Sequence, residues 1–164
     1  MPIQKVTVER FSVVTSRSFA EVVGAIDAAI GHPDMRAFWK DIAAAQSWRQ
    51  VENAIHAVLG HSGFMEFIRF DHGQFLRKGG VDSAPQIVRI VLGNPLIMKR
   101  MAEHVPDAGS YAPVTILVDE RSDGVHISYD RMASFLVLYG NLSALAVAQE
   151  LDAKVEALIA AAAG

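Results

Sequence analysis

Two stretches in the second half of the chain alternate apolar and polar residues and predict a pair of antiparallel strands. Apolar side chains occupy every second position from Val114 to Val118 and again from Val125 to Tyr129. The link between them ends in Gly124, where a tight turn calls for a left-handed backbone. These stretches therefore predict a β-hairpin with one face in the core and the other at least partly wet.

Other β-prone runs predict further strands. They span residues 11–15, 64–70 and 86–92. Asp71-His72-Gly73 is typical of a tight turn, so residues 74–77 are predicted to return as a short strand beside 64–70. Residues 78–85 are predicted to form a loop, because they contain two adjacent glycines and a proline.

Apolar residues at helical spacing, preceded by capping residues, predict the helices. Ser18 and Glu21 have the spacing of a capping box and open a helix that ends at Gly31. Residues 34–60 continue a helical pattern in which Ser47 repeats the capping signature, which indicates two helices or a kink. Further helices are predicted after Gly93-Asn94-Pro95, near residues 133–139 and from about residue 142.

The composition excludes several classes of protein. Of the 164 residues, 51% are hydrophobic and 20% are charged, which excludes a disordered chain and fits one domain with a large core. The net charge of -3 and the lack of a basic run argue against a nucleic-acid partner. The absence of cysteine excludes disulfide bonds, thiolate nucleophiles and iron–sulfur clusters.

Two segments bear on location and membrane association. The N-terminal segment lacks the basic and apolar regions of a secretory signal, so a cytoplasmic location is expected. Residues 132–149 carry no formal charge, as a membrane span would, but Gly140-Asn141 breaks the stretch and Ser134 adds a polar group. We therefore expect a buried pair of helices here and no membrane partner.

The order of these segments resembles the DUF302 family. Gly93-Asn94-Pro95 follows a strand, the small-residue loop 106–113 ends in proline, and a hairpin with an Asp123-Gly124 turn leads to Tyr129-Asp130. The resemblance covers residues 86–131 well. It implies an α+β fold with an antiparallel sheet of about five or six strands, helices packed mainly on one face, and frequent dimerisation. It implies no reaction.

The helical stretch 34–60 is longer than the family pattern, and we interpret it as an insert within a single domain of residues 1–164. The insert displays Phe38, Trp39 and Trp48, which is more large apolar surface than one sheet face covers. A homodimer is therefore expected.

Asp71 and His72 form the most suggestive acid–base pair, because a carboxylate can fix the tautomer of an imidazole and raise its basicity. Neighbouring side chains on a strand point apart, however, and these residue types are ordinary turn formers. No Gly-x-Ser-x-Gly motif supplies a serine nucleophile. The turn interpretation is therefore favoured over catalysis.

The strand-to-helix junction at Asn94 is a candidate anion site, because free amides at a helix N-terminus can hold an anion and Lys99 follows soon after. The alternative is that Asn94 only makes the turn. Tyr111 and Tyr129 combine an apolar ring with a hydroxyl, as residues of ligand pockets often do. The candidate ligand-binding residues are Asn94, Lys99, Tyr111, His126 and Tyr129.

The six histidines show no His-Glu-x-x-His spacing, so no local metal site is encoded. His61, His72 and Glu66 could still assemble in space, but scattered histidines are more often surface residues. We therefore expect neither a metal nor a cofactor.

Two classes of function follow from these observations. The favoured one is a non-enzymatic homodimeric module that binds a small ligand, with an anion as one candidate, or another protein, because the polar candidates are dispersed along the chain. The alternative is a small enzyme that uses His72 and Asp71 as acid and base beside an anion-binding turn at Asn94.

Overall fold

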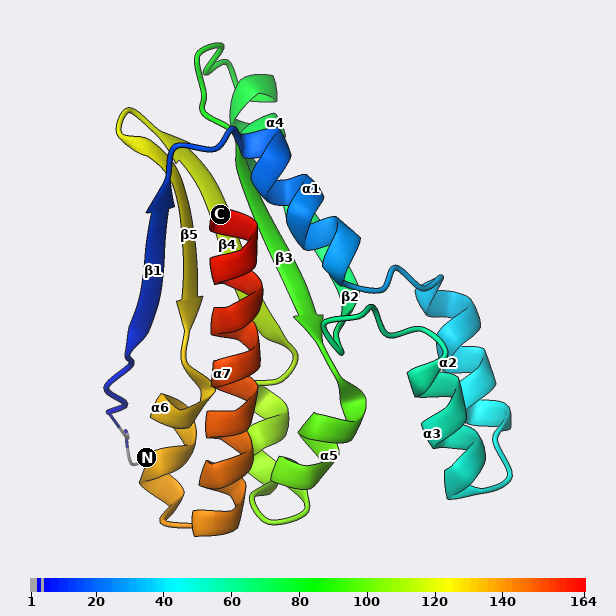
Figure 1. Ribbon diagram of the computed structural model, residues 1–164. Helices are drawn as coiled ribbons and strands as arrows, with labels where there is room; N and C mark the ends of the chain where they lie inside the picture. The colour runs from blue at the N-terminus through cyan, green and yellow to red at the C-terminus, as the bar shows by residue number, and fades with distance from the viewer. Residues whose placement is uncertain (1–2, 4) are drawn as a thin grey trace.

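Five strands form one antiparallel sheet in the computed structural model, which describes residues 3 and 5–164 (Figure 1). They are β1 (Arg10–Thr15), β2 (Met65–Asp71), β3 (Ile87–Gly93), β4 (Val114–Arg121) and β5 (Gly124–Asp130). Their order across the sheet is β1-β5-β4-β3-β2, and each neighbouring pair is antiparallel. The predicted strands 11–15, 64–70 and 86–92 and the predicted hairpin are confirmed to within one residue at each end.

Helices and loops make up the rest of the described chain. The α-helices are α1 (Phe19–Ala29), α2 (Met35–Ala44), α3 (Trp48–His56), α4 (His72–Lys78), α5 (Pro95–Ala102), α6 (Met132–Leu136) and α7 (Leu142–Ala163), and the 3₁₀ helices are η1 (Pro106–Ser110) and η2 (Val137–Tyr139). Figure 1 shows α1 and α7 lying across one face of the sheet. The α+β fold with helices mainly on one face is therefore confirmed.

The capping signals locate the helix starts correctly. Ser18 and Glu21 make the reciprocal hydrogen bonds of a capping box at the start of α1. Ser47 accepts a hydrogen bond from the amide of Gln50 and begins α3, so the stretch after residue 34 is two helices.

The main core lies between the sheet and α1 and α7. The long helix α7 contributes a stripe of side chains at helical spacing, each at most 7% exposed: Val147, Leu151, Val155, Leu158 and Ile159. Burying an aliphatic side chain of this size contributes roughly 1.5–3 kcal/mol, so this stripe fixes α7 on the sheet.

The strand register divides the sheet into two faces. Phe11, Ile116 and Tyr129 lie on the face that the helices cover. Their sequence neighbours Arg10 and Asp130 pair with each other across β1 and β5 and point the other way. We call this second surface the open face.

One predicted element is wrong. Residues 74–77 do not form a strand, because the carboxylate of Asp71 accepts a hydrogen bond from the amide of Gln74 at 2.7 Å and caps α4. Asp-His-Gly therefore starts a helix here, and the antiparallel partner of β2 is β3. The strand prediction failed because residues that favour turns also favour helix N-caps.

The helices α2 and α3 form an arm that extends beyond the edge of the sheet (Figure 1). A small core of Phe38, Ile55 and Met65 holds the arm together. Phe38 is only 3% exposed, so the expectation that it is displayed is wrong, whereas Trp39 and Trp48 are 52% and 47% exposed. The arm therefore keeps two of the three aromatic residues on its surface.

Backbone contacts fasten the base of the arm. The amides of Gly31 and Gly60 both donate to the carbonyl of Phe64, each at 2.9 Å. A Cβ at Gly31 would lie 1.8 Å from the carbonyl oxygen of Val58, so only glycine permits this close approach.

Residues 132–149 are divided between α6, η2 and α7, and Gly140 between them has a φ of 64°. In the part of the chain that the structure describes, no helix combines the length and the apolar character of a membrane span.

Candidate functional site

A hollow with a volume of about 450 Å³ lies on the open face of the sheet. This volume is in the usual range for small-molecule sites. Side chains from four adjacent strands contribute to it, together with residues of η1 and α6 at one end. The lining includes Arg10, Arg89, Ser110, Tyr111, Thr115, Leu117, Ser128, Asp130 and Phe135. We call it the sheet-face cavity.

Arg10 and Asp130 form an ion pair at one side of the cavity. The Nε and Nη2 atoms of Arg10 donate to the two carboxylate oxygens of Asp130 at 2.6 and 2.9 Å. The hydrogen bond from Arg10 lowers the pKa of Asp130 below its ordinary value, so the carboxylate is ionised at neutral pH. The two charges therefore largely cancel.

Arg89 supplies a second positive charge, and this one has no acidic partner. Its Nη2 donates to the hydroxyl of Thr115 at 3.3 Å, and its guanidinium carbon lies 5.7 Å from the centre of the Phe70 ring. Among the described residues, no carboxylate lies within 4.0 Å of it. An arginine held by an aromatic ring and a hydroxyl keeps donors free for an anion.

Aromatic residues form one end of the cavity. The rings of Tyr111 and Phe135 stack with their centres 4.7 Å apart. The hydroxyls of Tyr111 and Tyr139 share a hydrogen bond of 3.1 Å, which raises the pKa of Tyr139 to about 12. The Tyr139 phenol is therefore neutral at ordinary pH, and this end of the cavity offers ring surface and hydroxyl groups.

Of the predicted ligand-binding residues, Tyr111 lines the sheet-face cavity, whereas the phenol of Tyr129 lies on the helix-facing side. Tyr129 borders the cavity through its strand, but its hydroxyl donates to the buried carboxylate of Asp152 at 2.6 Å. Burial raises the pKa of Tyr129, and the negative charge of Asp152 raises it further. The phenol therefore stays protonated as part of the core.

Asn94 uses its side chain to build the junction before α5. Its carbonyl oxygen accepts from the amide of Leu96 at 2.9 Å, and its amide nitrogen donates to the carbonyl of Gly63 at 3.0 Å. This is the role of an N-cap that also ties α5 to the chain before β2. These contacts therefore support the interpretation that Asn94 forms the turn before α5 and does not bind an anion.

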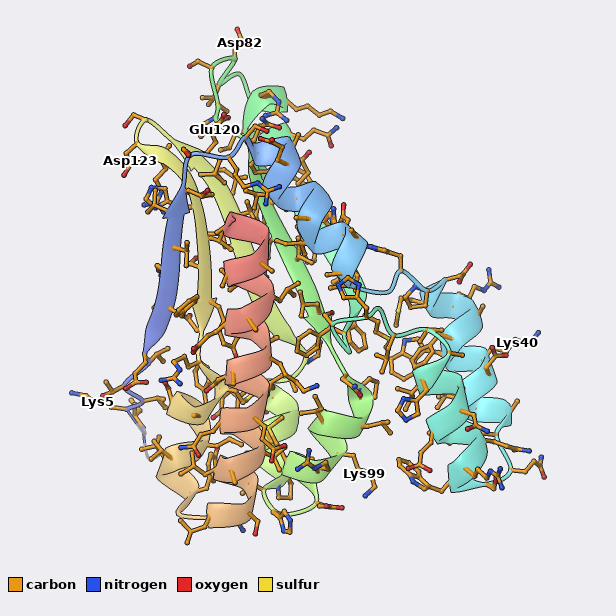
Figure 2. The ribbon with its side chains drawn as sticks, in the orientation of Figure 1. Lys5, Lys40, Asp82, Lys99, Glu120 and Asp123 are labelled. Carbon is orange, nitrogen blue, oxygen red and sulfur yellow. The ribbon has the colours of Figure 1, made fainter. Side chains whose placement is uncertain are left out.

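Lys99 and His126 lie far from each other. Lys99 forms an ion pair with Glu103 at 2.7 Å, and its ammonium lies 5.3 Å from the centre of the Trp48 ring. His126 is 2.8 Å from Asp123 at the β4–β5 turn, and this hydrogen bond lowers the pKa of Asp123. Figure 2 shows Lys99 and Asp123 toward opposite ends of the molecule. These candidates do not form one site.

Asp71 and His72 lie at the start of α4, outside the sheet-face cavity. Asp71 serves as the N-cap, and the ring of His72 stacks on Phe70 with the centres 6.0 Å apart. No hydrogen bond links the two side chains, so the carboxylate does not orient the imidazole. The geometry lacks the contact that a general base with its orienting acid requires.

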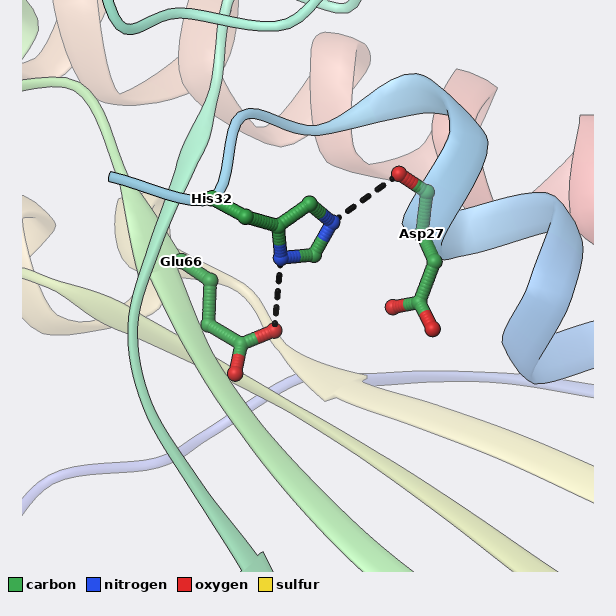
Figure 3. A group of neighbouring side chains, drawn as sticks. All are labelled: Asp27, His32 and Glu66. Atoms are coloured by element: carbon green, nitrogen blue, oxygen red, sulfur yellow. Dashed lines mark hydrogen bonds and ion pairs between the residues drawn. The ribbon is translucent and has the colours of Figure 1, made fainter. Parts of the chain in front are cut away.

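One group of potential metal ligands comes together, at the base of the arm. Asp27, His32 and Glu66 place ligand atoms within 4.8 Å of one another, and His32 Nδ1 lies 3.6 Å from Glu66 (Figure 3). Arg69 donates to both carboxylates, and its hydrogen bond to Asp27 raises the pKa of the guanidinium. Its positive charge therefore already pairs with both carboxylates, as a bound cation would.

The structure thus brings Glu66 beside His32 rather than beside His61 and His72, the partners that the sequence had suggested. The chain between His32 and Glu66 forms the arm, whose two ends return to the same point. His32 and Glu66 are close only because the chain returns to this point, so the local sequence does not predict their proximity.

Sequence reasoning also missed Arg10 and Arg89, the two arginines of the sheet-face cavity. Arg89 lies at a polar position within an otherwise apolar strand, and this exception was the available signal. That the two arginines share a cavity follows only from the strand order, which places β1 and β3 on either side of β5 and β4.

Comparison with known proteins adds a family and a fold. The model of the family described as "Domain of unknown function DUF302" matches residues 40–162. A crystal structure of an uncharacterized conserved DUF302 protein from Bacillus stearothermophilus superposes with a TM-score of 0.66 at 12% sequence identity. The superposition covers 93% of this chain and 97% of the other. No curated protein matches the chain.

Proposed function

We propose that this chain, which belongs to the DUF302 family, is a non-enzymatic module that binds a small organic anion in the sheet-face cavity. The observation that carries the proposal is Arg89, whose charge has no acidic partner within the described residues. The family description names no activity, so the proposal depends on the geometry of the cavity.

The lining indicates the chemistry of the ligand. Arg89 offers donors to a carboxylate or phosphate, and Ser128 lies on the same face two strands away, with Leu117 of β4 between them. The stacked rings of Tyr111 and Phe135 offer a flat apolar surface at one end. A carboxylate attached to a ring or a short apolar chain satisfies both ends, so an aromatic or short aliphatic acid is the ligand class.

Amide chemical shifts of ¹⁵N-labelled protein test this site with benzoate as the probe. We expect saturable shifts at Thr115, Ser128 and Tyr111, all of which line the cavity. Unchanged amides at these positions with millimolar benzoate, acetate and inorganic phosphate would contradict the proposal.

Homodimerisation is part of the same proposal. Val14 on β1 and Ile68 on β2, at opposite edges of the open face, are 50% and 49% exposed, and a second copy of the chain lying across this face would remove both from water. Light scattering should give the mass of a dimer at micromolar concentration. The double variant Val14→Lys and Ile68→Lys should give the mass of a monomer, because like charges would then meet across the contact.

The enzyme alternative has weaker support. Asp71 and His72 make structural contacts and lie outside the cavity that holds Arg89. We expect His72→Ala to leave the benzoate-induced shifts unchanged. A loss of those shifts in His72→Ala, with the fold intact, would revive the enzyme hypothesis.

A further inference from the structure

A second cavity, with a volume of about 260 Å³, lies between the arm and the helix-facing side of the sheet. Trp39 of α2 forms its wall on the arm side, and the other lining residues come from β2, the β3–α5 junction, α5, the segment 109–114 and α7. Its largest lining side chains are Trp39, Phe67, Met98, Met101 and Leu151. We call it the arm cavity.

The arm cavity has an apolar lining. None of the described residues that line it is charged, and its polar side-chain groups are the amide of Asn94 and the indole N–H of Trp39. The side-chain oxygen and nitrogen of Asn94 are already bonded to Leu96 and Gly63. A charged or strongly polar occupant would lose its hydration here without finding a new partner, so the lining favours an uncharged apolar group.

The size of the arm cavity limits that group. An apolar protein cavity of roughly 150 Å³ accepts benzene, so about 260 Å³ accommodates a substituted or fused ring or a short hydrocarbon chain. Met98 and Met101 have flexible thioether side chains, which adjust readily to ligands of different outline.

Trp39 lies at a side of the cavity that is accessible to solvent. Its side chain is 52% exposed, although its ring lies 6.5 Å from Phe67 and 5.0 Å from Phe38. A tryptophan that is half in water and half against other rings gains buried area when an apolar ligand settles beside it.

We propose that the arm cavity is a second binding site, which takes an uncharged aromatic ring or short hydrocarbon chain between Trp39 and the methionines of α5. The two cavities share Pro113 and Val114, but Arg89 and the other polar side chains line only the sheet-face cavity, so the two sites differ in chemistry. The lining of the arm cavity comes from the arm and from elements at the end of the sheet, so the arm would contact the ligand through Trp39.

Fluorescence of Trp39 tests the proposal directly. The chain has two tryptophans, so the variant Trp48→Phe leaves Trp39 as the sole source of tryptophan emission. Titration with p-xylene and with 1-hexanol should change this emission along a saturating curve. In ¹³C-methyl spectra the same probes should shift Met98 and Met101, which line the cavity, more than Met35, which does not.

Met98→Glu places a charge in the arm cavity and should weaken p-xylene binding by about tenfold or more. The matched control is Leu142→Glu, which makes the same kind of change at a residue that is 80% exposed, and it should bind as the parent does. If Met98→Glu fails to fold, Trp39→Ala with the methionine signals as readout takes its place and should also weaken binding.

Three results would overturn the proposal. They are an emission change that rises linearly without saturation, equal shifts of all methionine methyls, and unchanged p-xylene affinity in the variants of Met98 or Trp39. Arg89→Gln should leave p-xylene binding intact, so failure of the anion proposal and failure of this one are distinguishable.

Discussion

Replacing Asp152 with alanine is expected to destabilise the fold strongly, because it removes the acceptor of three donors and leaves two of them, the Tyr129 hydroxyl and the Ala133 amide, without a partner. The Asp152 carboxylate is completely buried and accepts from the Tyr129 hydroxyl at 2.6 Å and from the amides of Met132 and Ala133 at 2.7 and 3.1 Å. These bonds join β5 and the start of α6 to α7. The carboxylate is therefore a junction between three elements.

The size of the effect follows from the number of donors. An unsatisfied buried donor costs about 1–3 kcal/mol, and relaxation recovers part of it, so we expect Asp152→Ala to lower the free energy of unfolding by about 3–5 kcal/mol. Arg131 adds little to this loss, because it keeps ion pairs with Glu9 at 2.8 Å and Glu156 at 2.9 Å. Tyr129→Phe removes one donor and should cost about 1–2 kcal/mol.

Urea unfolding at neutral pH measures these differences. The matched control is Glu150→Ala in the same helix, whose exposed side chain pairs with Arg100 at the surface, and it should change stability by less than about 0.5 kcal/mol. The reasoning is refuted if Asp152→Ala lies within about 1 kcal/mol of the parent, or if Tyr129→Phe costs as much as Asp152→Ala.

Four further substitutions test separate parts of the structure. Gly31→Ala should destabilise the protein by about 2–4 kcal/mol in thermal unfolding, whereas Gly24→Ala, in an open helical position, should stabilise it by about 0.5–1 kcal/mol. Asn94→Ala should cost about 1–2 kcal/mol and leave benzoate affinity unchanged. Asp130→Asn should remove the stabilisation that the carboxylate gains from Arg10. This stabilisation is complete above the ordinary aspartate pKa of about 3.9 and is lost as the pH falls through the lowered pKa of Asp130. Urea unfolding across pH measures the difference between variant and parent, and a difference that persists below the lowered pKa would contradict the prediction.

The parts of the fold that the sequence predicted are those with a local cause. Alternation and a glycine turn specify the β4–β5 hairpin, and Ser18 with Glu21 specifies the start of α1. The start of α4 was missed because Asp71 is equally suited to a turn and to a helix cap, and the sequence alone does not decide between them.

The sites were harder to predict, because both cavities combine residues from distant segments. Arg89 becomes significant only when β4 and β5 place it on the same face as Ser128. Tyr129 illustrates the opposite error. The alternation already placed it with the buried residues of β5, and its hydroxyl satisfies a buried carboxylate rather than a ligand. A polar atom on a core-facing residue was a better guide to an internal hydrogen bond than to a pocket.

Calorimetric titration of benzoate into the parent protein and Arg89→Gln tests the central claim most directly. Arg100→Gln is the matched control, because it removes an arginine of α5 whose charge pairs with Glu150 at the surface. Benzyl alcohol serves as the probe with the same ring and no charge. We predict that benzoate binds the parent and Arg100→Gln equally and binds Arg89→Gln about tenfold more weakly or worse, while benzyl alcohol does not distinguish the three proteins. Equal benzoate affinity for the parent and Arg89→Gln would contradict the account.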